Sequence, residues 1–240
     1  GTARKESRTD TARLLLQPAW SGRLRGKFIT FEGPEGSGKS TQVVFLGDWL
    51  QAEGHPYLIT REPGGTGIGG EIRSVLLSVR DGKMAPEAEL FLYEADRAQH
   101  IAEVIRPALD AGTHVLCDRF TDSTLAYQAF GRGLPEKRVR ELNAQASDGL
   151  VPDLTLLFEG STKENLQRAR GGPGGDRMEE EDLDFHERVW NGFLQLQRDD
   201  PARIRLVPKG SVEEVRDRVR CVVVGEFGWA GKPSAAKTQR

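Results

Sequence analysis

The sequence predicts an α/β fold in which a five-stranded parallel sheet is flanked by helices. Two observations predict it: short β-branched or apolar runs of strand length recur along the chain, and longer amphipathic stretches separate them. Strands and helices that alternate at these lengths build a parallel sheet covered on both faces. In such sheets, ligands bind at the carboxyl ends of the strands.

Five runs are predicted to form the sheet. The first, residues 27–32, directly precedes a glycine-rich stretch. The other four occupy residues 56–60, 113–117, 154–158 and 203–207. Each has the length of an ordinary strand.

The amphipathic stretch after the second run predicts a helix that begins near Pro86, a residue suited to the first turn of a helix. Apolar residues follow at spacings of three or four, as on a helix face packed against a core. These residues are Phe91, Ala95, Ala98, Ile101, Ile105 and Ala108. We therefore expect this stripe to face the interior.

Another helix is predicted near the carboxyl end of the chain. Ser211 and Glu214 have the spacing of a capping box, in which each side chain bonds the other residue's backbone N–H. Apolar residues at helical spacing accompany them, namely Val212, Val215, Val219 and Val222. The helix is expected to start at this box.

The length of 240 residues favours one domain, and a hydrophobic content of 37% can supply its core. We expect this domain to span residues 26–226. Residues 1–25 mix arginines with acids and indicate a disordered or peripheral extension, while the small, polar and cationic residues 227–240 indicate a disordered tail. Neither segment suggests a function.

Charge and cysteine content exclude several classes of partner. The formal net charge is −2, so no global field favours binding to nucleic acid or to an anionic membrane. No apolar run reaches the roughly 18 residues that a membrane span needs. The two cysteines form no CxxC pair, which fits a reducing compartment and a cytoplasmic protein.

The stretch FITFEGPEGSGKST contains the pattern G-x-x-x-x-G-K-[ST] between a predicted strand and a predicted helix. In this motif, glycines let backbone N–H groups converge on phosphate oxygens, and the helix start adds its positive dipole end. We expect Lys39 to reach the β- and γ-phosphates and the Ser40 hydroxyl to ligate Mg²⁺. The predicted ATP-binding residues are Gly33, Pro34, Glu35, Gly36, Ser37, Gly38, Lys39, Ser40 and Thr41. The fold is thus predicted to be the three-layer P-loop NTPase fold.

Other motifs separate the classes of P-loop protein. The Asn-Lys-x-Asp and Asp-x-x-Gly strings of GTPases are missing from the sequence, and so is the Leu-Ser-Gly-Gly signature of transport ATPases. Instead, a predicted strand ends in Asp118-Arg119. A strand-end carboxylate can organise Mg²⁺ and its water shell, and the arginine beside it can clamp a phosphate.

One pair of residues indicates a phosphoryl acceptor with a planar base. Tyr93 and Arg97 are four residues apart on a predicted helix, so the ring and the guanidinium share one face. Together they could stack on a base and hydrogen-bond to it.

A glycine- and proline-rich loop indicates a lid. The run RARGGPGGDRMEEED places Arg168, Arg170 and Arg177 around this loop. We expect a short lid over about residues 168–180. Its closure would exclude water and bring positive charge to the transferring group.

Together these motifs resemble thymidylate kinases, which phosphorylate thymidine monophosphate with ATP, and most closely the bacterial type. The likeness runs from about residue 26 to residue 226. It is carried by the P-loop with Glu35 and by TREPGGT (60–66), EIRSVLL (71–77), DRAQ (96–99), DRFTDSTLAYQ (118–128), PDLTLLFE (152–159) and the RAR…DRME lid. The resemblance implies an ATP- and Mg²⁺-dependent kinase for DNA precursor synthesis, commonly a homodimer.

The resemblance also implies which residues hold the acceptor phosphate. Glu35 matches a P-loop carboxylate that lies near the acceptor nucleotide. Pro63 matches a proline that follows a cis peptide bond and shapes the acceptor pocket. Arg73 and Arg119 match the arginines that bind the acceptor phosphate.

A further set matches the base and sugar sites of the family. Tyr93 falls where a base-stacking aromatic residue, usually Phe, is found, and Arg97 matches a residue that hydrogen-bonds thymine. Thr124 and Gln128 match groups that contact the pyrimidine. Tyr127 matches the ring that crowds the 2′ position and favours deoxyribose.

One departure concerns the charge used in catalysis. Some members of the family carry an arginine inside the P-loop and others use lid arginines, and here residues 34–37 include none. The lid is therefore expected to supply the charge, with Arg168, Arg170 and Arg177 all as candidates. They complete a predicted catalytic set with Lys39, Arg119 and Glu35.

Two alternatives stay open from the sequence. A deoxynucleoside kinase of the same superfamily would share the P-loop, an Asp-Arg pair and an arginine lid, but would use Glu35 as a base on a neutral hydroxyl. An ATP-dependent regulatory switch would need no arginine for an acceptor phosphate. Replacing Arg119 by alanine should separate the three.

Overall fold

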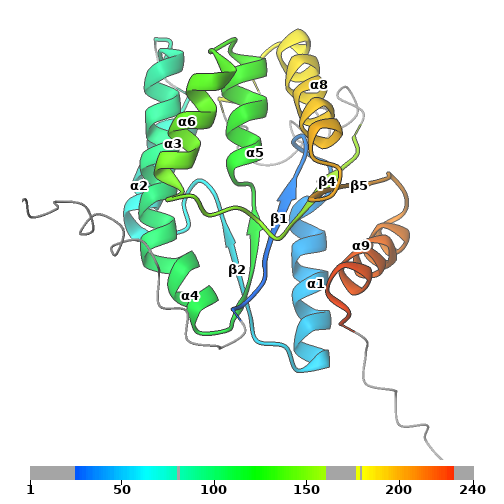
Figure 1. Ribbon diagram of the computed structural model, residues 1–240. Coiled ribbons are helices and arrows are strands. Elements are labelled where there is room, and N and C mark those ends of the chain that lie inside the picture. Colours follow the sequence, from blue (N-terminus) through cyan, green and yellow to red (C-terminus); the bar gives the residue numbers. More distant parts are fainter. Residues whose placement is uncertain (1–24, 80–81, 161–176, 179, 230–240) are drawn as a thin grey trace, which may run out of the picture.

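The computed structural model describes residues 25–79, 82–160, 177–178 and 180–229, and it contains the predicted parallel sheet (Figure 1). The strands are β1 (Phe28–Glu32), β2 (Tyr57–Arg61), β3 (His114–Asp118), β4 (Leu154–Phe158) and β5 (Ile204–Val207). They pair in the order β2-β3-β1-β4-β5, and every pairing is parallel. Each strand begins and ends within one residue of its predicted range.

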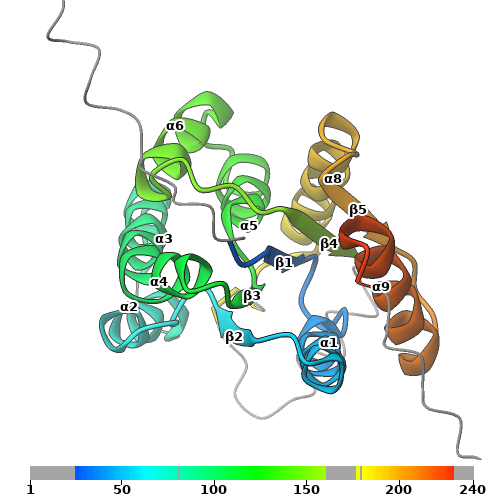
Figure 2. The ribbon, with the colours of Figure 1, turned by 60° about the horizontal axis from the view of Figure 1, so that its bottom comes forward.

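Helices connect the strands and cover the sheet. In chain order they are α1 (Lys39–Glu53), α2 (Gly67–Leu77), α3 (Pro86–His100), the π-helical η1 (Ile101–Ile105), α4 (Arg106–Asp110), α5 (Thr121–Thr124), the π-helical η2 (Leu125–Gly131), α6 (Glu136–Ala146), α8 (Leu183–Asp199) and α9 (Val212–Phe227). Figure 2 shows α1 and α9 on one side of the sheet and α5 and α8 on the other. Among the described helices, none is long and apolar enough to cross a bilayer.

The central strand β1 is buried along its whole length, because its alternating side chains meet apolar residues on both faces. Ile29 and Phe31 pack with residues of α1 and α9. Phe28 packs with residues of η1 and α4. The glycine-rich loop that follows β1 therefore emerges from the middle of the sheet.

The capping box predicted for the last helix is confirmed. Ser211 Oγ accepts a hydrogen bond from the Glu214 N–H, and the Glu214 carboxylate accepts one from the Ser211 N–H. Beyond the end of α9, Trp229 packs on His114 with 4.4 Å between ring centroids. The packed chain therefore continues past residue 226, the predicted end of the domain.

The apolar stripe predicted to face the core from Pro86 onward was wrong over its first half. Ile101 and Ile105 are buried, but Phe91 is 49% exposed, and Ala95 and Ala98 are exposed as well. The buried side chains of α3 are mostly polar, namely Glu89, Leu90, Glu94, Asp96, Arg97 and His100. Periodicity failed here because these polar groups bond to one another and to neighbouring segments, which makes their burial tolerable.

Candidate active site

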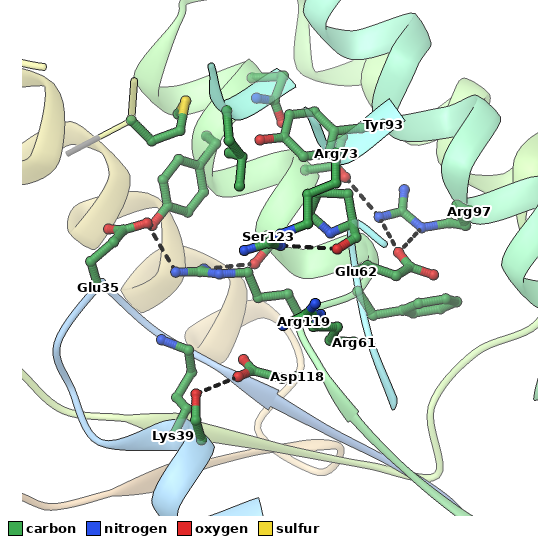
Figure 3. A pocket seen from close by; sticks show the side chains of 18 of the residues that line it. Glu35, Lys39, Arg61, Glu62, Arg73, Tyr93, Arg97, Asp118, Arg119 and Ser123 are labelled. Carbon is green, nitrogen blue, oxygen red and sulfur yellow. Dashed lines mark hydrogen bonds and ion pairs between the residues drawn. The ribbon is translucent and has the colours of Figure 1, made fainter. Parts of the chain in front are cut away.

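A cavity of about 340 Å³ lies where the carboxyl ends of the central strands meet the P-loop, α2, α3 and η2 (Figure 3). Its size is that of a small-ligand site. The basic side chains that line it are Lys39, Arg61, Arg73, Arg97 and Arg119. The acidic ones are Glu35, Glu62 and Asp118. The excess of positive charge suits an anionic ligand.

The P-loop curls at the end of β1 because two glycines meet demands that other residues cannot. A Cβ atom at Gly33 would lie 2.7 Å from the Phe158 carbonyl oxygen. Gly38 has a φ of 91° and stands at the N-cap of α1, where it brings no side chain to cap the helix. The first N–H groups of α1 are therefore available to phosphate oxygens.

Lys39 lies along this loop and is only 6% exposed. Its ammonium donates hydrogen bonds to the carbonyl oxygens of Gly33, at 3.0 Å, and Pro34, at 2.7 Å. Burial, with a smaller contribution from the charge of Arg119, lowers its pKa to about 8. A bound phosphate would offer charged acceptors, which bind an ammonium more strongly than carbonyl oxygens do.

Ser40 and Asp118, the two predicted metal residues, lie side by side. The Ser40 hydroxyl donates to Asp118 Oδ2 at 2.8 Å. The other carboxylate oxygen, Oδ1, is buried and has no hydrogen-bond partner among the described residues. A hydroxyl and a carboxylate oxygen fit Mg²⁺, which is usually bound by one or two protein oxygens together with water and substrate phosphates.

Arg119 connects the P-loop to the cavity. Its guanidinium donates to Glu35 Oε1 at 3.0 Å and to Ser123 Oγ at 3.1 Å, and Tyr127 donates its hydroxyl proton to the same Glu35 oxygen at 2.5 Å. Burial alone would raise the pKa of Glu35, but the charges of Arg119 and Lys39 and the Tyr127 hydroxyl hold it below its usual value. Glu35 is therefore ionised and fixes the guanidinium.

The backbone at Arg119 is also unusual. Its φ of 72° is in the left-handed region, which costs a non-glycine residue about 1–2 kcal/mol. The Arg119 N–H donates to the Phe31 carbonyl at 3.0 Å and so continues the pairing of β3 with β1, which places the left-handed residue directly at the end of β3. Residues held in such conformations cluster at functional sites.

The loop after β2 forms another wall of the cavity. The Glu62-Pro63 peptide bond is cis, as the resemblance implied. Arg73 of α2 donates to the Pro63 carbonyl at 2.9 Å, and Asp96 of α3 accepts from the Gly64 N–H at 3.0 Å. These contacts hold the loop on two helices, and Pro63 and Arg73 both line the cavity.

Tyr93 and Arg97 both line the cavity, together with Thr124, Tyr127 and Gln128. Arg97 is 2% exposed, and each of its three guanidinium nitrogens lies within 3.0 Å of a partner. These partners are Glu62, Glu94, Asn143 and Thr124. A hydrogen bond from Arg97 to a base would have to share one of these donors.

Of the predicted lid arginines, Arg168 and Arg170 lie outside the described residues. Arg177 is described, and it does not line the cavity. Its Nε donates to the Leu76 carbonyl at 2.9 Å, and its guanidinium forms an ion pair with Glu89 at 2.5 Å. Arg177 thus ties its segment to α2 and α3.

Three polar lining residues were not predicted as site residues from the sequence: Arg61, Glu62 and Ser123. Arg61 and Glu62 come directly before Pro63 at the carboxyl end of a predicted strand, where ligands bind in parallel sheets. That position was the available signal for both. Ser123 stands four residues before Tyr127, so helical spacing would have placed it on the same face.

The fold and the cavity define a class of protein. A parallel sheet with a P-loop, a Ser-Asp pair suited to Mg²⁺ and an adjoining basic cavity together describe a P-loop kinase that acts on a small phosphorylated molecule. The family model for thymidylate kinase matches residues 31–219. The chain belongs to the thymidylate kinase family, whose members transfer phosphate from ATP to thymidine monophosphate.

Individual relatives agree with this assignment. The chain is 54% identical over 187 residues to the thymidylate kinase of Desulfovibrio desulfuricans, covering 75% of this chain and 86% of the relative. It is 50% identical over 199 residues to that of Gloeobacter violaceus, covering 82% and 93%. The crystal structure of thymidylate kinase from Ehrlichia chaffeensis matches with a TM-score of 0.68 and 30% identity, over 83% of this chain and 98% of the other. A deoxynucleoside kinase is not favoured.

Proposed function

We propose that this protein phosphorylates thymidine monophosphate with ATP bound at the P-loop, and that positioning carries most of the catalysis. One observation carries the proposal: Arg119 bonds to the P-loop through Glu35 and also lines the basic cavity. It can therefore hold an acceptor phosphate against the donor. A regulatory switch would have no use for this arrangement.

In the proposed reaction, an oxygen of the acceptor phosphate attacks the γ-phosphorus in line, and the bond to the β-phosphate oxygen breaks to release ADP. Lys39 and the N–H groups of the P-loop neutralise the donor, while Arg73 and Arg119 orient the acceptor. Mg²⁺, which Ser40 and Asp118 would hold, supplies further neutralisation of the triphosphate when bound. No strong base is required, because a phosphate monoester has its second pKa at about 6.

The rest of the cavity is proposed to select the nucleoside. The Tyr93 ring would stack on the base, while Thr124 and Gln128 contact its polar edge. Tyr127 would crowd the 2′ position of the sugar and so favour deoxyribose. Its hydroxyl bond to Glu35 supports this assignment, because that bond holds the ring in place.

We assign the lid charge in the transition state to Arg168 or Arg170. Arg177 is less suited to this role, since its guanidinium is paired with Glu89. We further propose that residues 26–226 form one catalytic domain, extended by the packed residues up to Trp229. The free thiols of Cys117 and Cys221 support a cytoplasmic location, where thiols stay reduced.

A homodimer is also proposed, formed through the continuous outer face of α3 and η1. Phe91, Ala95, Ala98 and Ala102 recur at helical spacing and are all exposed. Apolar surface of this kind marks an interface, and small residues let a second helix approach closely. Replacing Phe91 by Glu should convert a dimer to a monomer in sedimentation velocity. A monomeric parent protein at tens of micromolar would refute the dimer.

The function is tested by ADP release from Mg-ATP with different acceptors offered separately. We expect turnover with thymidine monophosphate, less with deoxyuridine monophosphate, and little with ribothymidine monophosphate, AMP or free thymidine. The Arg119→Ala variant should lose activity by about 10³-fold while ATP binding stays nearly intact. Turnover of free thymidine alone would instead make Glu35 the base of a nucleoside kinase.

A further inference from the structure

Glu89 of α3 is completely buried and joins three side chains from other segments. Its Oε1 accepts hydrogen bonds from Gln128 Nε2 at 2.8 Å and from Arg132 Nε at 3.1 Å. Its Oε2 accepts from Arg132 Nη2 at 3.1 Å and lies 2.5 Å from Arg177 Nη2. Only Gln128 among these partners lines the cavity described above.

The charge of Glu89 fixes the orientation of the Gln128 amide. Burial alone would raise the pKa of Glu89, but the hydrogen bonds and charge of Arg132, the Gln128 amide and the charge of Arg177 hold it below its usual value. An ionised carboxylate can only accept hydrogen bonds, so the group of Gln128 that faces it must be the NH₂. The carbonyl oxygen of Gln128 is then the polar atom left for the cavity.

Thr124 complements this oxygen on the same wall of the cavity. Its Oγ1 accepts a hydrogen bond from Arg97 Nη2 at 2.9 Å. Because Arg97 can only donate, the hydroxyl proton of Thr124 remains free to donate elsewhere. Between them, Thr124 and Gln128 therefore offer one donor and one acceptor to the cavity.

This pattern discriminates between pyrimidines. Thymine and uracil present an acceptor at O4 and a donor at N3–H, whereas cytosine presents a donor at its 4-amino group and an acceptor at N3. The acceptor and donor of thymine or uracil match the Thr124 hydroxyl and the Gln128 carbonyl. Cytosine would instead place its amino donor against the Thr124 donor and its N3 acceptor against the Gln128 acceptor. Sites built to hydrogen-bond a ligand reject one that leaves buried polar groups unpaired.

We propose that Glu89 is a positioning residue that sets this base selectivity by holding the Gln128 amide in one orientation. The inference rests on the proposed function, because it concerns the acceptor cavity of the same reaction. Glu89 touches no substrate itself. Its ion pairs with Arg132 and Arg177 add a structural role, which the experiment must separate from selectivity.

The test is the Glu89→Gln variant. A glutamine at position 89 can donate to Gln128 as well as accept from it, so the Gln128 amide could rotate and exchange the places of its carbonyl and NH₂ groups. We expect the ratio of kcat/KM for thymidine monophosphate over deoxycytidine monophosphate to fall by roughly 30-fold or more, mainly through the acceptor KM. Deoxyuridine monophosphate has the same polar edge and should decline in parallel with thymidine monophosphate. The KM for ATP should not change.

A matched control removes another partner of the same carboxylate. Arg177→Met breaks an ion pair of Glu89 but leaves the Gln128 bond in place, so the selectivity ratio should stay at its original value. The double variant Glu89→Gln with Arg177→Met restores the net charge lost in the single variant. The double variant should show the same altered selectivity ratio as Glu89→Gln. It also replaces the single variant in the test if the single variant does not fold.

A uniform loss of activity with every acceptor, or a lower melting temperature with the ratio unchanged, would show that Glu89 is only structural and would overturn the inference. An altered ratio in Arg177→Met alone would do the same. Failure of the proposed function would look different, because the unmodified protein would then show no turnover with thymidine monophosphate.

Discussion

Two helices of 15 residues, α1 and α3, both build the cavity, but they do so with different parts. The N-terminus of α1 supplies Lys39 and Ser40, and the flank of this helix packs into the core through residues such as Leu46 and Leu50. The flank of α3 supplies Tyr93 and Arg97, and its apolar stripe faces outward. A helix end binds ligands through its backbone N–H groups, and such a site can be recognised from a short sequence motif. A helix flank binds through side chains, and the partners of these side chains lie far away in the sequence.

The partners of α3 show why a polar flank can be buried. Arg97 is paired with Glu62 of the β2 loop, Asn143 of α6 and Thr124 of α5. Unpaired charges in such a place would cost several kcal/mol each. Loss of a buried cation should therefore have different effects at the two helices: Lys39 at the α1 terminus should matter for chemistry, and Arg97 on the α3 flank should matter for stability.

The largest expected effect is the loss of catalysis in Lys39→Met. Removing the ammonium should lower kcat by about 10³-fold, because it takes away charge stabilisation at the transferring group. Stability should change little, since Lys39 bonds mainly to backbone carbonyls and its lowered pKa shows that burial disfavours its charge. Steady-state kinetics and thermal melting measure the two quantities. A large fall in melting temperature with an unchanged kcat would contradict the expected difference between the α1 terminus and the α3 flank.

At the flank of α3, Arg97→Met should mainly cost stability. The substitution leaves the buried carboxylates of Glu62 and Glu94 without their guanidinium, which is expected to lower the free energy of unfolding by about 3–5 kcal/mol. Urea titration measures this difference.

The control for this loss is Arg140→Met on α6. Arg140 forms an exposed pair with Glu136, one turn away, so its removal should cost less than about 1 kcal/mol. Equal losses in the two variants would mean that the network around Arg97 contributes no more than a surface pair.

A smaller effect is expected at Glu32, at the end of β1. Burial first, and then the charge of Asp122, raise the pKa of Glu32 from 4.5 to about 7. Between these two pH values the folded protein keeps a proton that the unfolded chain has released, so stability should decrease as the pH rises from 4.5 to 7. The loss levels off as the pH rises through 7, where the folded protein releases the same proton.

Glu32→Gln should flatten that dependence, because the amide carries no titrating proton. The measurement is the free energy of unfolding by urea at pH 5 and pH 8 for both proteins. The parent should lose more stability between the two pH values than the variant does. An identical slope in the variant would assign the pH dependence to other groups.

The sequence was enough to predict the parts of the protein that local patterns encode. The strands were predicted to within one residue, because short runs rich in β-branched and aromatic residues, such as FITFE, favour strands. The P-loop and the meeting of Ser40 with Asp118 were predicted from a motif and from a strand end. Each of these signals is contained in a few consecutive residues.

The rest depended on segments that come together only in the fold. Phe91 was expected inside because apolar spacing is normally a core signal, and the sequence did not show that Glu62, Asn143 and Thr124 would gather around the opposite face of α3. Likewise, the pairing of Arg177 with Glu89 joins residues far apart in the chain. No local pattern reports such a pair.

The dipeptide Asp118-Arg119 has a consequence for how the two nucleotides are spaced. Asp118 reaches Ser40 on the ATP side, while the next residue reaches Glu35 and Ser123 on the acceptor side. Adjacent Cα atoms are about 3.8 Å apart across a trans peptide bond. One peptide unit thus sets the distance between the groups that hold the donor and those that hold the acceptor. A single residue inserted between Asp118 and Arg119 would move the two nucleotides apart, even though every side chain of the site would still be present.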